Sequence, residues 1–344
     1  MTAALCALLA AVFYAVNTPF SKVLLQYVPA TLMAAFLYLG AGLGMGVIYL
    51  FHRKNEPESE RLSRRDLPYT IGMIVLDIAA PIFLMLGIRL GSAANASLLG
   101  NFEIVATTFI ALLLFREAVS KKLWFAISLI TLSGLLLSFD GQGLTFSSGS
   151  LLVLAATLCW GLENNCTRQI SDKSAYEIVL LKGVFSGGGS LVIGRIIGEK
   201  MPQPRYILFA MLLGFVAYGL SIFLYIKAQK KLGAAKTSAY YAAAPFIGSL
   251  LAFAVLGEKL TGTFFAAFLI MLCGSAFVVC DTLETSHTHR HTHTVCHTHD
   301  GSTHTHCFTH EHFHRHWGSS EKHTHTHTHR GLFDDREHLS AHHK

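Results

Sequence analysis

Histidine alternates with threonine near the C-terminal end of the chain, where residues 285–344 contain every histidine except His52. Successive side chains of an extended chain lie on opposite sides, so histidines two residues apart share a side and can chelate one ion together. Imidazole is a ligand for zinc, nickel, cobalt and copper, and a nearby thiolate favours the softer or borderline ions. The candidate ligands are His287, His289, His291, His293, Cys296, His297, His299, His304, His306, Cys307, His310, His312, His314, His316, His323, His325, His327 and His329.

This tail has three other interpretations: a neutral low-complexity expansion, a patch whose charge changes with pH, or an artefact of expression. Its alternation is interrupted by cysteines and acidic residues, which is unlike a purification tag. A segment of this composition cannot build a packed core, so we expect it to be disordered in the absence of metal. The sequence therefore predicts a disordered tail that binds Zn, Ni, Co or Cu ions.

A second set of polar residues lies inside long apolar segments, where an ionisable group costs roughly 2.5–3.5 kcal/mol on membrane-insertion scales. Such groups usually face a cavity or a partner, and Pro81, one turn after Asp77, also frees a backbone carbonyl. Aromatic rings nearby can stack on a flat or cationic molecule. The predicted substrate pathway is formed by Asn17, Asp77, Glu103, Trp160, Glu163, Asn164 and Tyr241.

Structural roles compete with this interpretation, because Asn and Glu also form hydrogen bonds between helices and Asp77 can neutralise a basic group. Lys182 is either a counter-ion or a side chain that reaches the membrane surface, and Lys22 is expected to reach the surface. The glycine-rich stretches 40–46 and 187–189 are interpreted as close helix-packing surfaces rather than as phosphate loops.

The elements that position these residues are predicted to be membrane-spanning helices. The chain is 52% hydrophobic and 14% charged, which is too apolar for a soluble globular domain. A span needs about 20 mostly apolar residues. Ten segments qualify, at residues 3–27, 31–51, 68–88, 92–115, 121–139, 149–170, 176–198, 206–229, 236–256 and 261–280.

Charge sets the expected orientation, because cytoplasmic loops retain Lys and Arg. Most of these residues follow the second, fourth, sixth and eighth segments, so both termini are predicted to be cytoplasmic in the plasma (inner) membrane. The net charge of +6 lies in the membrane part, which indicates topology rather than nucleic-acid binding.

The chain also contains an internal repeat. The stretch Leu114-Phe115-Arg116-Glu117-Ala118 recurs as Val255-Leu256-Gly257-Glu258-Lys259, and each copy precedes a helix that ends on a glycine. Five crossings invert the second copy relative to the first, which is the inverted-repeat plan of secondary transporters. The predicted domains are repeats at residues 1–140 and 141–284, followed by the tail at 285–344. The expected fold is thus all-α, with ten transmembrane helices in two inverted five-helix repeats.

Residues 3–281 resemble EamA-type members of the drug/metabolite transporter superfamily in these repeated motifs and in the ten apolar segments. The resemblance implies a carrier of amino acids, nucleotide sugars, drugs or other metabolites. It does not extend to the histidine tail.

Three functions follow as expectations. The leading one is a gradient-driven secondary transporter that exports a small organic metabolite. Glu103 or Glu163 would exchange protons, and no cofactor would be required for transport. The first alternative is a divalent transition-metal exporter fed by the tail, although the spans contain no histidine. The second is a membrane-anchored metal buffer or sensor. No nucleotide-binding motif and no nucleophile with a base at motif spacing occur, so an ATP-driven pump or an enzyme is not expected. The expected partners are the lipid bilayer, a small-molecule substrate, transition-metal ions and a second copy of the chain.

Overall fold

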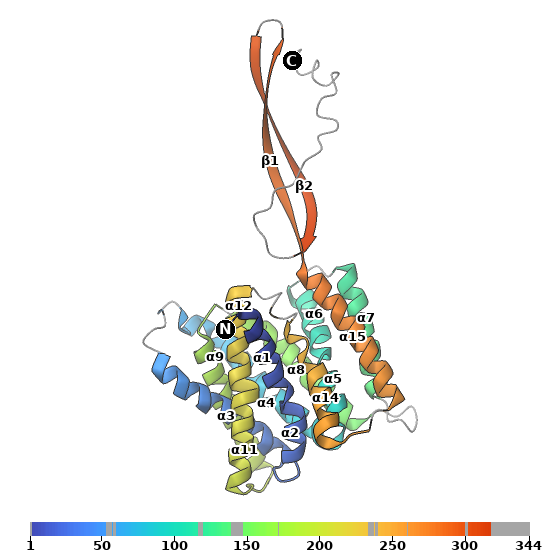
Figure 1. Ribbon diagram of the computed structural model, residues 1–344. Coiled ribbons are helices and arrows are strands. Elements are labelled where there is room, and N and C mark those ends of the chain that lie inside the picture. The colour runs from blue at the N-terminus through green and yellow to red at the C-terminus, as the bar shows by residue number, and fades with distance from the viewer. Residues whose placement is uncertain are drawn as a thin grey trace. The chain divides into compact units, whose positions relative to one another are not determined.

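The computed structural model describes residues 2–52, 57, 60–115, 120–138, 147–170, 172–232, 237, 240–259, 261–299 and 302–317. It divides into two compact units, residues 1–283 and residues 284–344. The first unit is a bundle of helices (Figure 1).

Apolar residues dominate these helices, and polar residues or prolines mark several of their starts. The side chains of Ser92, Ser147 and Ser174, for example, each accept a hydrogen bond from the first turn of the following helix. The helices of the first half are α1 (Ala3–Ala15), α2 (Asn17–Leu24), α3 (Ala30–His52), the 3₁₀ turn η3 (Arg64–Asp66), α4 (Leu67–Leu90), α5 (Ala93–Leu99), α6 (Phe102–Phe115) and α7 (Lys121–Ser138).

The second half contains two π-helical stretches within longer helices. Its elements are α8 (Ser148–Arg168), α9 (Ala175–Leu181), η4 (Lys182–Ser186), α10 (Gly187–Ile196), α11 (Pro204–Gly214), η5 (Phe215–Leu220), α12 (Ser221–Leu232), α14 (Ala244–Leu256) and α15 (Gly262–Leu283).

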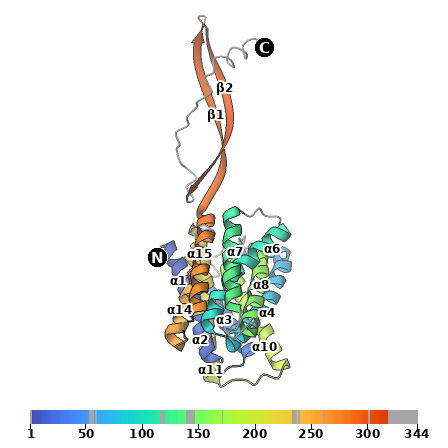
Figure 2. The ribbon, with the colours of Figure 1, turned by 90° about the vertical axis from the view of Figure 1, so that its right-hand side faces the viewer.

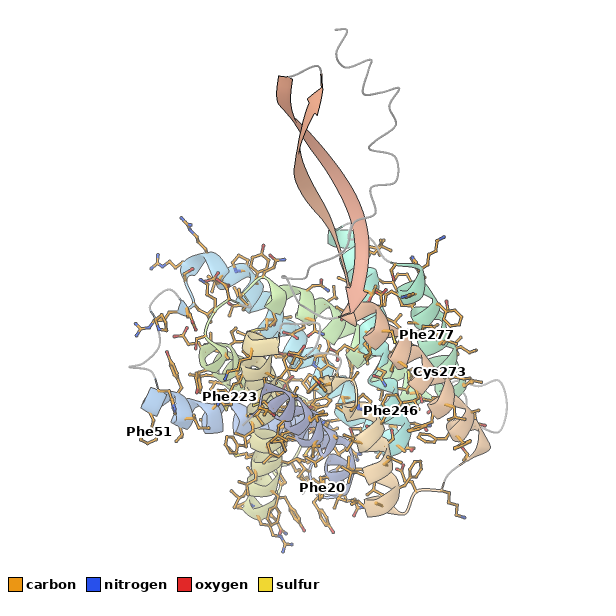
Figure 3. The ribbon with its side chains drawn as sticks, turned by 45° about the horizontal axis from the view of Figure 1, so that its top comes forward. Phe20, Phe51, Phe223, Phe246, Cys273 and Phe277 are labelled. Carbon is orange, nitrogen blue, oxygen red and sulfur yellow. The ribbon has the colours of Figure 1, made fainter. Side chains whose placement is uncertain are left out.

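Seven helical stretches among the described residues are long and apolar enough to cross a membrane. The ten spans stay a prediction for three local reasons. The segment 92–115 is broken between α5 and α6, the C-terminal part of α8 is polar from Glu163 to Asn165, and α14 has only 13 residues. Large apolar side chains are exposed on the outside of the bundle, such as Phe20 at 44% and Phe51 at 79% (Figure 3). An outer surface of this kind suits lipid rather than water.

The helix pairs of the bundle form a pattern that is symmetric on exchange of its halves. Helix α1 packs against α12, and α8 packs correspondingly against α4. Helix α6 lies against α8 as α14 lies against α1, while α7 and α15 pair with each other (Figures 1 and 2). Two related five-helix repeats predict this exchange. The domain boundaries themselves stay a prediction.

Helix α3 packs closely on the second half through glycine. A Cβ on Gly40 would lie 2.0 Å from the carbonyl oxygen of Met211, and one on Gly183 would lie 2.2 Å from the Cα of Gly42. In the stretch 187–189, a Cβ on Gly187 or Gly189 would also lie too close to a neighbouring residue. A Cβ on Gly188 would have no neighbour within 4 Å. The backbones therefore approach where glycine allows it, as small-residue packing in membranes requires.

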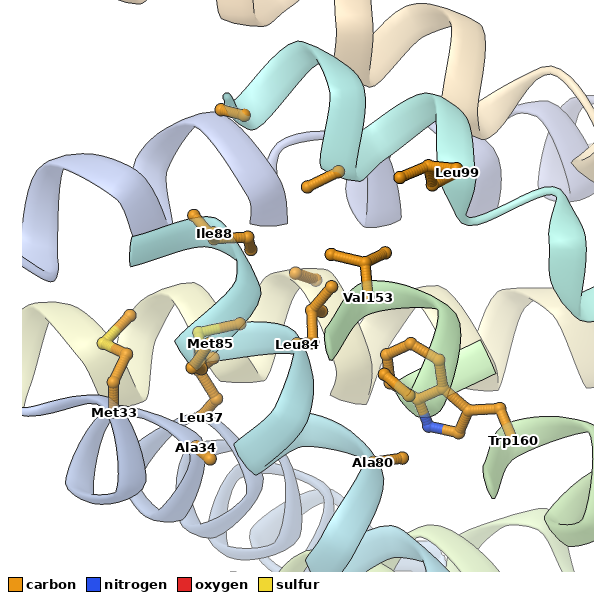
Figure 4. Packing of buried hydrophobic residues seen from close by; sticks show 14 of the residues in the cluster. Met33, Ala34, Leu37, Ala80, Leu84, Met85, Ile88, Leu99, Val153 and Trp160 are labelled. Carbon is orange, nitrogen blue, oxygen red and sulfur yellow. The ribbon is translucent and has the colours of Figure 1, made fainter. Parts of the chain in front are cut away.

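The buried core of the bundle joins α3, α4, α5 and α8. Leu37, Leu84, Ile88 and Val153 belong to one cluster, and Trp160 lies in it with 8% of its surface exposed (Figure 4). The core therefore fixes the relative positions of the helices that carry the polar residues.

The second unit contains a hairpin of two antiparallel strands, β1 (Glu284–His299) and β2 (Ser302–Trp317). Alternating threonine is β-branched, which favours the extended backbone of these strands. Disorder of the tail in the absence of metal stays a prediction. The predicted ligands His323, His325, His327 and His329 lie outside the described residues.

Candidate functional site

Three ionisable side chains meet inside the bundle. Lys182 Nζ lies 2.7 Å from Glu163 Oε1 and 3.2 Å from Asp77 Oδ2. Tyr38 donates its hydroxyl to Asp77 Oδ1 at 3.1 Å, and Thr167 donates to Glu163. Asp77 is 1% exposed and Glu163 is 2% exposed, so this charge cluster is shielded by protein. The structure thus places Lys182 as a counter-ion rather than at the membrane surface.

Local irregularities of the helices lie at this charge cluster. Helix α4 continues through Pro81, which has no N–H to donate to the carbonyl of Asp77, four residues earlier. Lys182 begins the π-helical stretch η4, and π-helical turns are frequent at functional sites. The missing hydrogen bond at Pro81 and the π-helical stretch η4 thus both lie at the charge cluster.

The cluster contains two carboxylates and one ammonium group. Fully ionised, it carries one uncompensated negative charge, and burying a charge costs several kcal/mol even after relaxation. A proton, or a cationic group of a bound molecule, would remove that excess. The arrangement can therefore exchange a positive charge.

A second polar contact joins α6 to α8. Asn164 donates its amide Nδ2 to Glu103 Oε1 at 2.5 Å. Glu103 lies in the first turn of α6, directly after the break at Gly100 and Asn101. The amide Nδ2 of Asn101 is buried and has no hydrogen-bond partner among the described residues. The break thus leaves a polar donor free inside the bundle near the start of α6.

A row of tyrosines extends from the charge cluster. The ring of Tyr38 lies 5.1 Å from that of Tyr218, which lies 5.9 Å from Tyr14. Tyr14 lies 5.8 Å from Tyr241. Asn17 donates its amide to the hydroxyl of Tyr218 at 3.0 Å. Asn17 and Tyr241 are therefore connected to Asp77 through aromatic side chains of both halves.

The predicted pathway residues thus form two contact groups, and Trp160 borders the first of them. Asn17, Asp77, Glu163 and Tyr241 belong to the charge cluster and the tyrosine row, and Glu103 with Asn164 forms the second contact. Trp160 belongs to the apolar core, and its side chain is also in hydrogen-bonding contact with Tyr38 of the charge cluster. Sequence reasoning did not single out Tyr38, Tyr218 or Thr167. The one signal available for Tyr38 is its position just before the glycine stretch 40–46 of α3.

Carboxylates at the helix ends have structural partners. Glu258 of the repeated motif accepts hydrogen bonds from Ser92 Oγ and from the backbone N–H groups of Ala93 and Ala94, at 2.7–3.0 Å. Glu258 therefore caps α5, which favours a negative charge there. The preceding Gly257 has φ +62°, a conformation that suits glycine. The other copy of the motif, around Glu117, lies outside the described residues.

The structure gives the partners of the Lys22 ammonium group, while its position at the membrane surface stays a prediction. Its Nζ donates to the carbonyl oxygens of Ile88 at 2.5 Å and of Gly91 at 2.6 Å, at the C-terminal end of α4. A cation at this position satisfies carbonyls that have no helical partner.

Metal ligands are not brought together within the bundle. No group of three or more His, Cys, Asp or Glu that could hold a metal ion occurs among the described side chains. For the tail, the structure gives the strand register, which is Cα pairing rather than side-chain geometry.

Comparisons with known proteins agree with the arrangement of the bundle. The pattern of the EamA-like transporter family matches residues 1–139 and 147–280. An "Uncharacterized transporter" of Methanothermobacter thermautotrophicus is 26% identical over 285 residues, which cover 77% of this chain and 82% of that protein. A solved chain described as "Crystal structure of protein" has a TM-score of 0.61 at 16% identity, covering 81% of this chain and 96% of that chain. The last likeness concerns the fold alone.

Proposed function

This chain belongs to the EamA-like transporter family, and from that premise we propose that it is a gradient-driven exporter of a small organic metabolite. The family is one of transporters rather than enzymes, and the bundle is a multi-pass membrane protein. The proposed location is the plasma membrane, with both termini in the cytoplasm.

The observation that carries this proposal is the buried contact of Lys182 with Asp77 and Glu163. Its excess negative charge gives the bundle a place for one exchangeable proton, and each of the three side chains comes from a different helix. A substrate group that binds Lys182 or a carboxylate would displace one of the present partners. Movement of the helices would then depend on whether proton or substrate holds the site, which is how a gradient drives alternating access.

The test is metabolite efflux from cells that express the full chain. Extracellular metabolites are compared between cells with the wild-type protein, with Glu163→Gln and with Asp172→Asn. Asp172 is a matched control, because its carboxylate is 70% exposed and outside the cluster. We expect one or a few metabolites to accumulate outside wild-type and Asp172→Asn cells, and at least tenfold less outside Glu163→Gln cells. Equal efflux from all three, at equal protein levels, would exclude a coupling role for Glu163.

We propose further that the tail binds divalent transition metal ions. Its support is the density of imidazole side chains, since nineteen histidines lie in residues 285–344 and imidazole suits Zn, Ni, Co and Cu. In this proposal metal acts on the tail as a signal or store, while the bundle moves an organic substrate.

A divalent metal exporter is the second candidate, because a metal-binding tail next to a transporter bundle can deliver ions to it. Elemental analysis of metal-challenged cells separates the candidates, using the full chain, a chain ending at Glu284 and Glu103→Gln. If the full chain lowers one metal and both variants restore it, metal is the substrate. If the metal content of the cells depends only on the presence of the tail, the proposal of an organic substrate remains. If, in addition, no metabolite efflux is found, the chain is a metal buffer or sensor.

A further inference from the structure

The register of the hairpin sorts its side chains by type. Residues directly opposite each other share a face, and residues two apart along a strand share that face as well. The pairs include His287 with His314, His289 with His312 and His291 with His310. A fourth such pair, His297 with His304, lies nearer the turn. We call these four pairs the histidine rungs.

All twelve histidines of β1 and β2 fall on one face of the hairpin by this register. The other face carries Cys296, Cys307 and most of the threonines, together with the oppositely charged pair of Arg290 and Glu311. Shifting one strand by a single residue would place histidines opposite residues of the other face. The sequence pattern and the strand register therefore agree in separating imidazoles from thiols.

Neighbouring histidine rungs have the spacing of a four-ligand site. Residues opposite each other in an antiparallel pair have Cβ atoms about 4.5–5.5 Å apart. Residues two apart on a strand are separated by about 6.6–6.8 Å. Two successive rungs thus place four histidines at neighbouring register positions, and four is the ligand number of tetrahedral zinc. The three successive rungs 287/314, 289/312 and 291/310 contain two overlapping sets of this kind.

We propose that the hairpin is a metal-dependent element whose principal site is formed by His287, His289, His312 and His314, with imidazole ligands and no thiolate. This inference rests on the proposed metal binding by the tail and adds the ligand set and its consequence for folding. An isolated two-stranded hairpin is marginally stable in water. Metal bound across both strands contributes its binding free energy to their pairing, so the ion holds the strands in this register.

The test uses purified full-length protein in detergent, titrated with Zn²⁺ by calorimetry and with Co²⁺ by visible absorption, which reports tetrahedral coordination. The decisive variant exchanges two neighbours, Thr288→His/His289→Thr. It keeps composition and histidine count but moves one ligand to the opposite face. We expect at least a tenfold weaker tightest site and a lower tetrahedral Co²⁺ signal. A chain that binds metal without strand pairing would show no difference, which overturns the inference while leaving metal binding by the tail in place.

Two further variants check ligand type and register. Cys296→Ser/Cys307→Ser should leave affinity and Co²⁺ spectrum unchanged, since both thiols lie on the other face. In that background, Thr288→Cys/Phe313→Cys joins opposite residues, whereas Thr288→Cys/Thr309→Cys joins residues four positions out of register. Zn²⁺ should increase the disulfide yield of the first pair only, measured by mass spectrometry. Equal yields would overturn the proposed register, and absence of any Zn²⁺ or Co²⁺ binding by the full chain would overturn the metal-binding proposal itself.

Discussion

Lys182 decides whether two buried carboxylates can coexist in the bundle. Its ammonium group contacts both Asp77 and Glu163, and its own side chain is 11% exposed. Removing one partner of a buried pair leaves the others without compensation, whereas removing an excess charge does not. The three side chains are therefore unequal in their effect on stability.

The first prediction follows from this inequality. Lys182→Met should destabilise the bundle by about 3–5 kcal/mol, because Asp77 and Glu163 lose their common cation. Asp77→Asn should have a much smaller effect, since the contact of Lys182 with Glu163 at 2.7 Å remains. The measurement is the thermal unfolding midpoint in detergent at one fixed scan rate. Similar midpoints for the two variants would contradict the assignment of Lys182 as a shared counter-ion.

The residues of the candidate site were predictable to different degrees. Asp77, Glu103 and Glu163 stand out because carboxylates are rare in apolar segments. The role of Lys182 as a counter-ion could not be predicted, because the depth of a residue in an apolar segment does not show the direction in which its side chain faces. Tyr38 and Tyr218 were missed because tyrosine is equally common in cores and at membrane surfaces.

At the scale of helices, α3 is held by glycine contacts on two sides. Its Gly42 meets Gly183 at the π-helical stretch η4, and Leu37 meets Gly214 next to η5. The sequence predicted the stretch 40–46 that contains Gly42, but not Gly183, Gly214, the π-helical turns or the break between α5 and α6. Those features depend on the packing of a helix against its neighbours. A hydropathy value averaged over a segment contains no information on that packing.

The second prediction compares two glycines of the same helical stretch. Gly183→Ala should destabilise the bundle by about 1–3 kcal/mol, because the new methyl group overlaps the backbone of Gly42. Gly188→Ala should be neutral or stabilising by up to about 1 kcal/mol, since its Cβ meets nothing within 4 Å and alanine favours helix. The measurement is the shift of the thermal unfolding midpoint from that of the wild-type protein. It should be negative for Gly183→Ala and zero or positive for Gly188→Ala. Equal destabilisation by both would show that close approach to a neighbouring backbone does not distinguish these two glycines.

The third prediction concerns the cap that Glu258 provides for α5. Glu258→Ala should cost about 1.5–3 kcal/mol, because it removes charge-assisted hydrogen bonds to Ser92, Ala93 and Ala94. Lys259→Ala, at the neighbouring position, is the matched control and should have little effect. Hydrogen exchange of the α5 amides provides a local readout. Unchanged protection of Ala93 and Ala94 in Glu258→Ala would reject the capping role.

At the scale of the whole molecule, the chain consists of a bundle and a tail that form separate compact units. The fourth prediction is that a chain ending at Glu284 keeps the thermal midpoint of the full-length protein in metal-free buffer, within about 1 °C for a ΔΔG near zero. The full-length protein treated with a chelator is the control. A clear drop on truncation would mean that the tail stabilises the bundle without metal.

The fifth prediction concerns orientation. Cys296 and Cys307 of the tail should react with a membrane-impermeant maleimide only after cells are permeabilised, because the distribution of Lys and Arg predicts a cytoplasmic tail. A cysteine at the exposed Gln203, between α10 and α11, should react in intact cells. Reaction of the tail cysteines in intact cells would reverse the proposed topology.

The π-helical stretch η4 also affects how this chain aligns with its evolutionary relatives. A π-helical turn contains one residue more than an α-helical turn, so it behaves as a single-residue insertion within a helix. Relatives without that insertion would align with a one-residue gap between Lys182 and Gly187. In a relative whose α10 keeps its place, a cation in the same alignment column would then face about 100° away from the carboxylates, because each helical residue turns by that angle. Descendants of one ancestral helix can therefore share the letter at position 182 without sharing its ion pair.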